Sequence, residues 1–188
     1  TVTLQETEQK AKLTATLKIG SDSTTKDFDI SVDAIENVEY AVKAITAPVE
    51  GTYKMFLNQV KLGKTLYFDG TVTSSEYLAT TEKAAKAADV VLAKVENGYT
   101  MTVNGKFIEI YTNSNNKQRP TLVDTATGAW TWNEELKLFA WTIGTSVYYL
   151  GTFNTFDTIS SSSISFITGD NAANIGVSQF PAYLGTMQ

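Results

Sequence analysis

The sequence of 188 residues contains no cysteine and no histidine. These two absences exclude thiol nucleophiles, Ser-His-Asp triads and the usual zinc sites. Metal binding through oxygen ligands stays open, but the calcium loop with alternating Asp or Asn and a closing Glu does not occur. A glycosidase would need two carboxylates placed a few ångströms apart, and the acidic residues are scattered along the chain. We therefore expect no metal, no cofactor and no enzymatic activity.

Positive charge is also scarce. The chain has 15 Lys and Arg against 20 Asp and Glu, a net charge of −5 and a pI near 4.8. The small cluster of Lys117 and Arg119 cannot follow a phosphate backbone, so nucleic acid is not an expected partner. No apolar run approaches the roughly 18 residues of a membrane-spanning helix, so no membrane insertion is expected. Because the sequence begins at Thr1 without a leader pattern, we expect a soluble part of a longer protein.

Residues 1–33 have the period-two alternation of β-strands. Apolar and polar residues alternate over residues 13–19 and 28–32, a polar turn separates the two runs, and residues 1–4 form a further short strand. The wording of residues 13–22 and 26–32 resembles the last strands of bacterial immunoglobulin-like domains, the stalk modules of surface proteins. The alternative is a plain hairpin packed on the main domain.

Residues 34–49 have the features of a helical linker between two domains. Asp33 and Glu36 form a capping box, apolar residues follow at helical spacing, and Pro48 ends the pattern. The sequence therefore predicts a helix over residues 34–46.

Residues 50–188 repeat a pattern with a period near 40 residues. At that offset Phe139 falls on Tyr99, and Val147 falls on Phe107. Each repeat is predicted to contain four short strands, and Asn104-Gly105 is the strongest hairpin signal. Three units of four strands resemble a β-trefoil, which implies a closed six-stranded barrel capped by three hairpins. A second β-sandwich or another closed barrel is the alternative.

Three tryptophans and two loops are candidate functional residues. Trp130 and Trp132 share a strand face, so they form either core or a sugar-stacking platform, and core is preferred for them and for Trp141. A first predicted ligand-binding set surrounds the turn near residue 155, where an exposed aromatic ring would lie beside amide and carboxylate groups. A second set lies in the polar loop of the preceding repeat. The first set is Tyr149, Phe153, Asn154 and Asp157, and the second is Asn113, Asn116 and Arg119.

Several phrases in fixed order resemble a repeat-containing β module of secreted or cell-wall proteins of gut Firmicutes. They include residues 64–70, 77–81, 147–160 and 175–182, and the likeness covers about residues 50–186. The resemblance implies an extracellular or cell-wall location. We expect the chain to be monomeric within a larger multi-domain protein. We expect an adhesion or accessory module that binds a glycan. The alternatives are binding of a host protein such as an immunoglobulin, a structural spacer and, last, a hydrolase.

Overall fold

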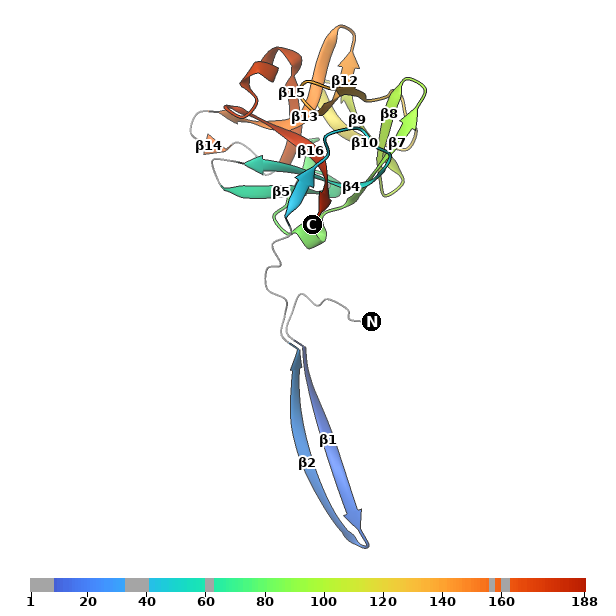
Figure 1. Cartoon of the computed structure of the whole chain (residues 1–188), viewed down its shortest axis with the longest axis vertical. Coiled ribbons are helices and arrows are strands. Elements are labelled where there is room, and N and C mark those ends of the chain that lie inside the picture. The colour runs from blue at the N-terminus through green and yellow to red at the C-terminus, as the bar shows by residue number, and fades with distance from the viewer. Residues whose placement is uncertain (1–8, 33–40, 60–62, 156–157, 160–162) are drawn as a thin grey trace. The chain divides into compact units, whose positions relative to one another are not determined.

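The computed structural model describes residues 9–32, 41–59, 63–155, 158–159 and 163–188 (Figure 1). The chain divides into two compact units, residues 1–39 and residues 40–188. The described parts of both units are built of β-strands, with two short 3-10 helices in the second unit, η1 (Ala84–Lys86) and η2 (Gly169–Asn174). The predicted all-β class is therefore confirmed. Among the described residues, no helix has the length and apolar character that crossing a bilayer requires.

The first unit is a long antiparallel hairpin. Strand β1 (Gln9–Ile19) pairs along its whole length with β2 (Asp22–Val32), and Gly20 and Ser21 form the turn. Gly20 has a φ of 62°, which suits the first position of a type II′ turn. The predicted alternating strands are confirmed here, whereas the short strand predicted at residues 1–4 lies outside the described residues.

The second unit contains fourteen described strands, many of them short. In chain order they are β3 (Val42–Ala44), β4 (Gly51–Gln59), β5 (Lys64–Val72), β6 (Leu78–Thr81), β7 (Asp89–Val95), β8 (Gly98–Val103), β9 (Lys106–Thr112), β10 (Gln118–Val123), β11 (Thr131–Asn133), β12 (Leu138–Ile143), β13 (Ser146–Thr155), β14 (Thr158–Ile159), β15 (Ser163–Thr168) and β16 (Gln179–Met187).

Six of these strands close into a barrel. Around the ring, β4 pairs with β5, β5 with β6, β6 with β15, β15 with β13, β13 with β16, and β16 with β4 again. From this ring the sheet continues through β7, β8, β9 and β10 on one side, and through β12 and β11 on the other. Closure removes the open edges that a flat sheet of this size would leave.

The strand pairing recurs three times along the chain. The first and second strands of each repeat pair as β4–β5, β8–β9 and β12–β13. The second and third strands pair as β5–β6, β9–β10 and β13–β15. The fourth strand pairs with the first strand of the next repeat as β7–β8 and β11–β12. The repeat of about 40 residues is thus a repeat of strand pairing.

The main apolar core of the second unit is built from side chains of all three repeats. Trp130 is 1% exposed and its ring centroid lies 5.1 Å from that of Trp141, which is 6% exposed. The Nε1–H of Trp130 donates to the Ile108 carbonyl oxygen at 2.8 Å, so its polar atom is satisfied. Both rings are therefore part of the core, as predicted from the sequence. Trp132 is partly buried and packs edge-on against Phe139.

The predicted linker helix is wrong where the structure describes it. Val42–Ala44 is strand β3, which pairs with Gly185, Thr186 and Met187 of β16. The spacing of Val42 and Ile45 suggested a helix. In the strand, Val42 and Ala44 instead pack against the buried Phe56 cluster. Tertiary pairing thus overrides a local pattern that fits two periodicities. Residues 33–40, which carry the predicted helix start, lie outside the described residues.

The Asn104-Gly105 hairpin forms as predicted between β8 and β9. Asn104 has a φ of 50° and Gly105 a φ of 77°, and Val103 pairs with Lys106 across the turn. Both central residues therefore have the positive φ of a type I′ turn.

We predict that Gly105→Val lowers the free energy of unfolding by about 1–2 kcal/mol, because a β-branched residue is strained at positive φ. A Cβ at Gly105 meets no atom within 4 Å, so the strain is purely that of the backbone. Urea unfolding measures the loss. Gly105→Asn is the control, since Asn tolerates this conformation, and an unchanged midpoint for the valine variant would contradict the assignment.

A second prediction concerns β3. A fragment that begins at residue 40 should fold with the stability of the second unit, whereas a fragment that begins at Pro48 lacks β3 and leaves the paired segment of β16 open. The urea midpoint of the shorter fragment should be lower, because partners of the Phe56 cluster are removed with the strand. Equal midpoints would show that β3 contributes nothing to the barrel.

Candidate functional site

Two loops from neighbouring repeats meet at one polar cluster. The first loop, residues 73–77, joins β5 to β6 and is closed by its own hydrogen bonds. Thr73 N donates to the Tyr77 carbonyl at 2.7 Å, Glu76 N donates to the Thr73 carbonyl at 3.0 Å, and Tyr77 N donates to the Thr73 hydroxyl at 3.2 Å. Glu76 has a φ of 63°, a left-handed conformation that costs a non-glycine residue about 1 kcal/mol or more.

The second loop, residues 113–117, joins β9 to β10 and is organised by Asn113. The Oδ1 of Asn113 accepts from the main-chain N–H groups of Asn115 and Lys117, each at 3.0 Å. Asn116 has a φ of 56°, which asparagine adopts more readily than most residues. The polar composition that predicted a loop also explains its conformation.

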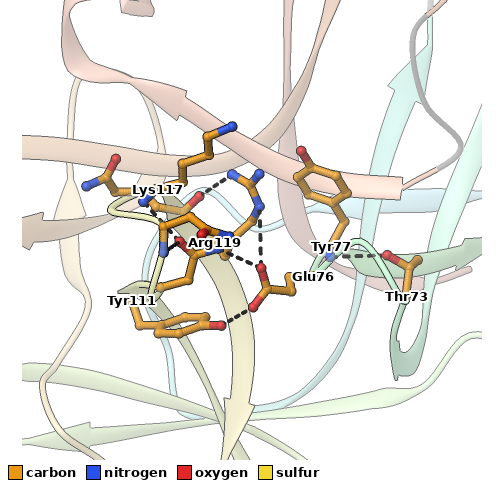
Figure 2. Close-up of polar contacts among 9 residues, drawn as sticks. Thr73, Glu76, Tyr77, Tyr111, Lys117 and Arg119 are labelled. Carbon is orange, nitrogen blue, oxygen red and sulfur yellow. Dashed lines mark hydrogen bonds and ion pairs between the residues drawn. The ribbon is translucent and has the colours of Figure 1, made fainter.

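The carboxylate of Glu76 joins the two loops (Figure 2). Its Oε1 accepts a short hydrogen bond from the Tyr111 hydroxyl, and its Oε2 accepts from Asn113 Nδ2 at 2.7 Å. The same Oε2 lies 4.0 Å from Arg119 Nε. The side chain of Glu76 is still 42% exposed, so the carboxylate is fixed in position and reachable from solvent.

Hydrogen bonding controls the ionisation of this cluster. The Tyr111 hydroxyl, then Asn113 and more weakly the Arg119 charge, lower the pKa of Glu76 below its ordinary value. The same hydrogen bond to Glu76, together with burial, raises the pKa of Tyr111. The pKa of Glu76 is lower in the folded state than in the unfolded state. Its hydrogen-bonded carboxylate therefore contributes fully to the free energy of unfolding at pH values above the unfolded pKa. That contribution is lost as the pH falls through the folded pKa.

Arg119 completes the cluster. Its guanidinium carbon lies 5.1 Å from the centroid of the Tyr77 ring, a cation–π contact, and its Nη1 donates to the Gln118 carbonyl at 2.8 Å. The side chain is only 18% exposed, and its Nε atom is buried with no hydrogen-bond acceptor among the described residues. The positive charge of Arg119 is thus held beside Glu76 in a long ion pair.

The two predicted ligand sets fare differently. Asn113, Asn116 and Arg119 of the second set lie on the β9–β10 hairpin, and Asn113 and Arg119 contact Glu76. The expectation that Tyr149 is exposed is wrong, because its side chain is 5% exposed in a core cluster with Leu138 and Ile167.

The position of Tyr149 on β13 explains this burial. In the extended strand its ring faces away from Tyr148, and a second apolar cluster covers that side. Its hydroxyl lies 3.2 Å from Asn133 Nδ2, which donates to it. Of the rest of the first set, Phe153 and Asn154 lie on β13, with backbone pairing to Gln179 and Ile159, and Asp157 lies outside the described residues.

Sequence reasoning missed Glu76, Tyr77 and Tyr111. The run of residues 73–76 is polar and marks a turn, which was a usable signal. No local signal shows that this turn meets the following repeat, because the contact joins residues 35 to 37 positions apart.

A buried carboxylate nearby has a structural role. Glu109 is 3% exposed, and it accepts from the Thr127 main-chain N–H at 2.7 Å and from the Thr127 hydroxyl. The Gly128 N–H lies 3.4 Å away. Glu109 therefore fastens the segment after β10 to β9. In the described part of the chain, no group of three or more acidic side chains is arranged to hold a metal ion.

Comparisons with known proteins give no assignment. No family model, curated protein or solved structure matches the chain.

We predict that Tyr111→Phe raises the pKa of Glu76 toward its ordinary value of 4.5, because the hydrogen bond removed is the largest cause of the lowering. An NMR titration of the Glu76 side-chain carboxyl carbon measures the change. Tyr53→Phe is the matched control, since the Tyr53 hydroxyl donates only to the Val49 carbonyl. An unshifted Glu76 titration in Tyr111→Phe would show that the hydrogen bond does not persist in solution.

Proposed function

We propose that the second unit is a β-trefoil that serves as a non-enzymatic binding module, and that its ligand is a glycan bound at the Glu76 cluster. The trefoil assignment is supported by the pairing scheme that recurs in three successive repeats around a closed barrel. The observation that carries the functional proposal is the carboxylate of Glu76, which is fixed by two side-chain donors, exposed to solvent and set on strained backbone.

A carboxylate of this kind suits sugar hydroxyl groups. Its two oxygens offer about four acceptor positions, of which Tyr111 and Asn113 use two. A pair of adjacent hydroxyls could donate to the remaining positions without moving the side chain. Backbone strain is often retained where a side chain must be held in position for a ligand, and Glu76 is such an outlier.

The flanking rings supply apolar surface. Tyr77 and Tyr111 are partly exposed on either side of Glu76, and phenol rings can cover the C–H face of a pyranose ring. Their cluster takes the place of the stacking surface expected from Tyr149. We propose no enzymatic activity, because the chain lacks histidine and cysteine, the residues that most readily move protons or attack carbonyls near neutral pH.

A protein ligand is the second candidate, and the contact between Arg119 and Tyr77 favours it. Arginine and tyrosine are the residue types that most often dominate the energy of protein–protein interfaces. Residues 114–117, which precede Arg119 in the same hairpin, are exposed and polar, as the rim of an interface is. A host protein such as an immunoglobulin would fit the proposed setting.

The setting we propose is that of a module in a secreted or cell-wall protein, with the β1–β2 hairpin as part of an immunoglobulin-like β-sandwich. The support is the resemblance in sequence and the amphipathic pairing of the two strands. A two-stranded sheet with one apolar face needs a second sheet to cover it.

We predict that Glu76→Gln weakens glycan binding at least about tenfold, because a neutral amide accepts hydrogen bonds less strongly than a carboxylate. A glycan array identifies the ligand for the wild-type chain, and calorimetry with that glycan compares the variants. Glu82→Gln is the matched control, since Glu82 is exposed and forms an ion pair with Lys64.

Circular dichroism should show both variants to be folded. Equal glycan affinity of the Glu76→Gln variant and the wild-type chain would show that the glycan does not bind at Glu76. The protein ligand would be favoured by two results together. No glycan on the array binds the chain, and the wild-type chain captures a serum protein that the Arg119→Ala variant does not capture.

A further inference from the structure

Arg119 is the only arginine of the chain, and all its other basic residues are lysines. A guanidinium differs from an ammonium because it presents several N–H donors in one fixed plane, a fork that matches the two oxygens of a carboxylate. The one guanidinium of the protein lies in the Glu76 cluster. The donors that it leaves free there therefore indicate which group of a ligand it can bind.

Contacts within the protein position the Arg119 guanidinium and leave part of it free. The Tyr77 ring lies 5.1 Å from the guanidinium carbon, and Nη1 donates to the Gln118 carbonyl at 2.8 Å. Nε is buried, whereas Nη2 is not buried and makes no hydrogen bond among the described residues. The Nη2 atom therefore offers donors to solvent from a side chain that is otherwise held in place.

Lys117 adds a second cation, two residues before Arg119. Its side chain is exposed, and its ammonium has no ion pair with the residues that the structure describes. In the view of Figure 2 the Lys117 ammonium and the Arg119 guanidinium lie on the same side of the Glu76 carboxylate, opposite the Tyr111 hydroxyl. The Glu76 charge balances one of the two cations. The cluster thus keeps an excess of positive charge on a protein whose net charge is −5.

We propose that the glycan bound at the Glu76 cluster is acidic, and that the sugar in the site is a hexuronate whose carboxylate binds Arg119 and Lys117. This inference rests on the glycan proposed for the cluster and narrows it to one class. Adjacent hydroxyls of the hexuronate donate to the free acceptor positions of Glu76. The sugar carboxylate accepts from Arg119 Nη2 and from the Lys117 ammonium.

A neutral hexose fits the cluster less well. Its hydroxyls can donate to Glu76, but they offer the two cations only uncharged acceptors. Removing water from a cation costs free energy that an anionic partner offsets. Hydrogen bonds between charged groups are also about twice as strong as those between neutral groups. Two cations are too few to follow a long polyanion, so we expect recognition of a single carboxylate.

Calorimetry with hexuronate oligosaccharides and with their methyl esters tests the inference. Esterification removes the charge of the carboxylate and keeps the ring hydroxyls, so each acid has a matched neutral form. The probes are oligosaccharides of galacturonate, glucuronate and mannuronate. We expect at least one acid to bind at least about tenfold more tightly than its ester, since a hydrogen bond to a charged group contributes about that factor. Its affinity should fall as the ionic strength rises.

Two variants locate the carboxylate. Lys117→Gln should weaken binding of the acid about threefold, as expected for an exposed ion pair, and should leave binding of the ester unchanged. Arg119→Lys keeps the charge but removes the fork, and should weaken binding of the acid at least about tenfold. Because Arg119 also packs on Tyr77, the exposed Lys117 gives a test that does not depend on packing. Lys94→Gln is the matched control, since Lys94 is an exposed lysine on β7.

Failure of this inference and failure of the glycan function give different results. An acid that binds no more tightly than its ester, beside a neutral glycan whose affinity depends on Glu76, would overturn the hexuronate and leave the glycan function in place. A chain that binds neither neutral nor acidic glycans would overturn both proposals. A preference for acids that both Lys117→Gln and Arg119→Lys leave unchanged would also overturn the hexuronate site.

Discussion

Closure of the barrel by β16 and β4 is the constraint on which the second unit depends. Ala182 to Gly185 of β16 pair with Lys54 to Leu57 of β4, and the other end of β16 pairs with β13. The strands approach closely where glycine allows it: a Cβ at Gly185 would lie 2.6 Å from the Lys43 carbonyl oxygen, and one at Gly151 would lie 2.6 Å from that of Phe180. Small residues at these crossings let the paired strands approach each other closely.

The Glu76 cluster is a consequence of that arrangement. Repetition of one unit places the β5–β6 loop beside the β9–β10 hairpin, and the polar ends of both can then bond to each other. Glu76 accepts a strained backbone because the main-chain bonds of its loop and two side-chain donors hold it. The same fixed position makes its carboxylate usable by a ligand, since little ordering remains to be done on binding.

The sequence was most informative where the interaction is local. Alternation predicted nearly all strands of the barrel, and Asn104-Gly105 predicted its turn, because both depend on residues adjacent in the chain. The helix expected through Val42 failed because pairing with β16 decided its conformation. Tyr149 was expected to be exposed. Alternation predicts that its ring and that of Tyr148 lie on opposite faces of the strand, but it does not show which residues cover the face of Tyr149. The meeting of Glu76 with Tyr111 depends on tertiary packing, which no local pattern encodes.

The recurrence of strand pairing also has a kinetic consequence. Hairpins such as β8–β9 join residues close in the chain and can form on a microsecond timescale, independently in each repeat. The contact of β16 with β4 joins segments more than a hundred residues apart, and a long loop must lose entropy before that contact forms. We therefore expect the ring-closing step to limit the folding rate, after rapid formation of the local hairpins. Stopped-flow refolding would contradict this order of events if substitutions in the β4–β16 contact left the slow phase unchanged.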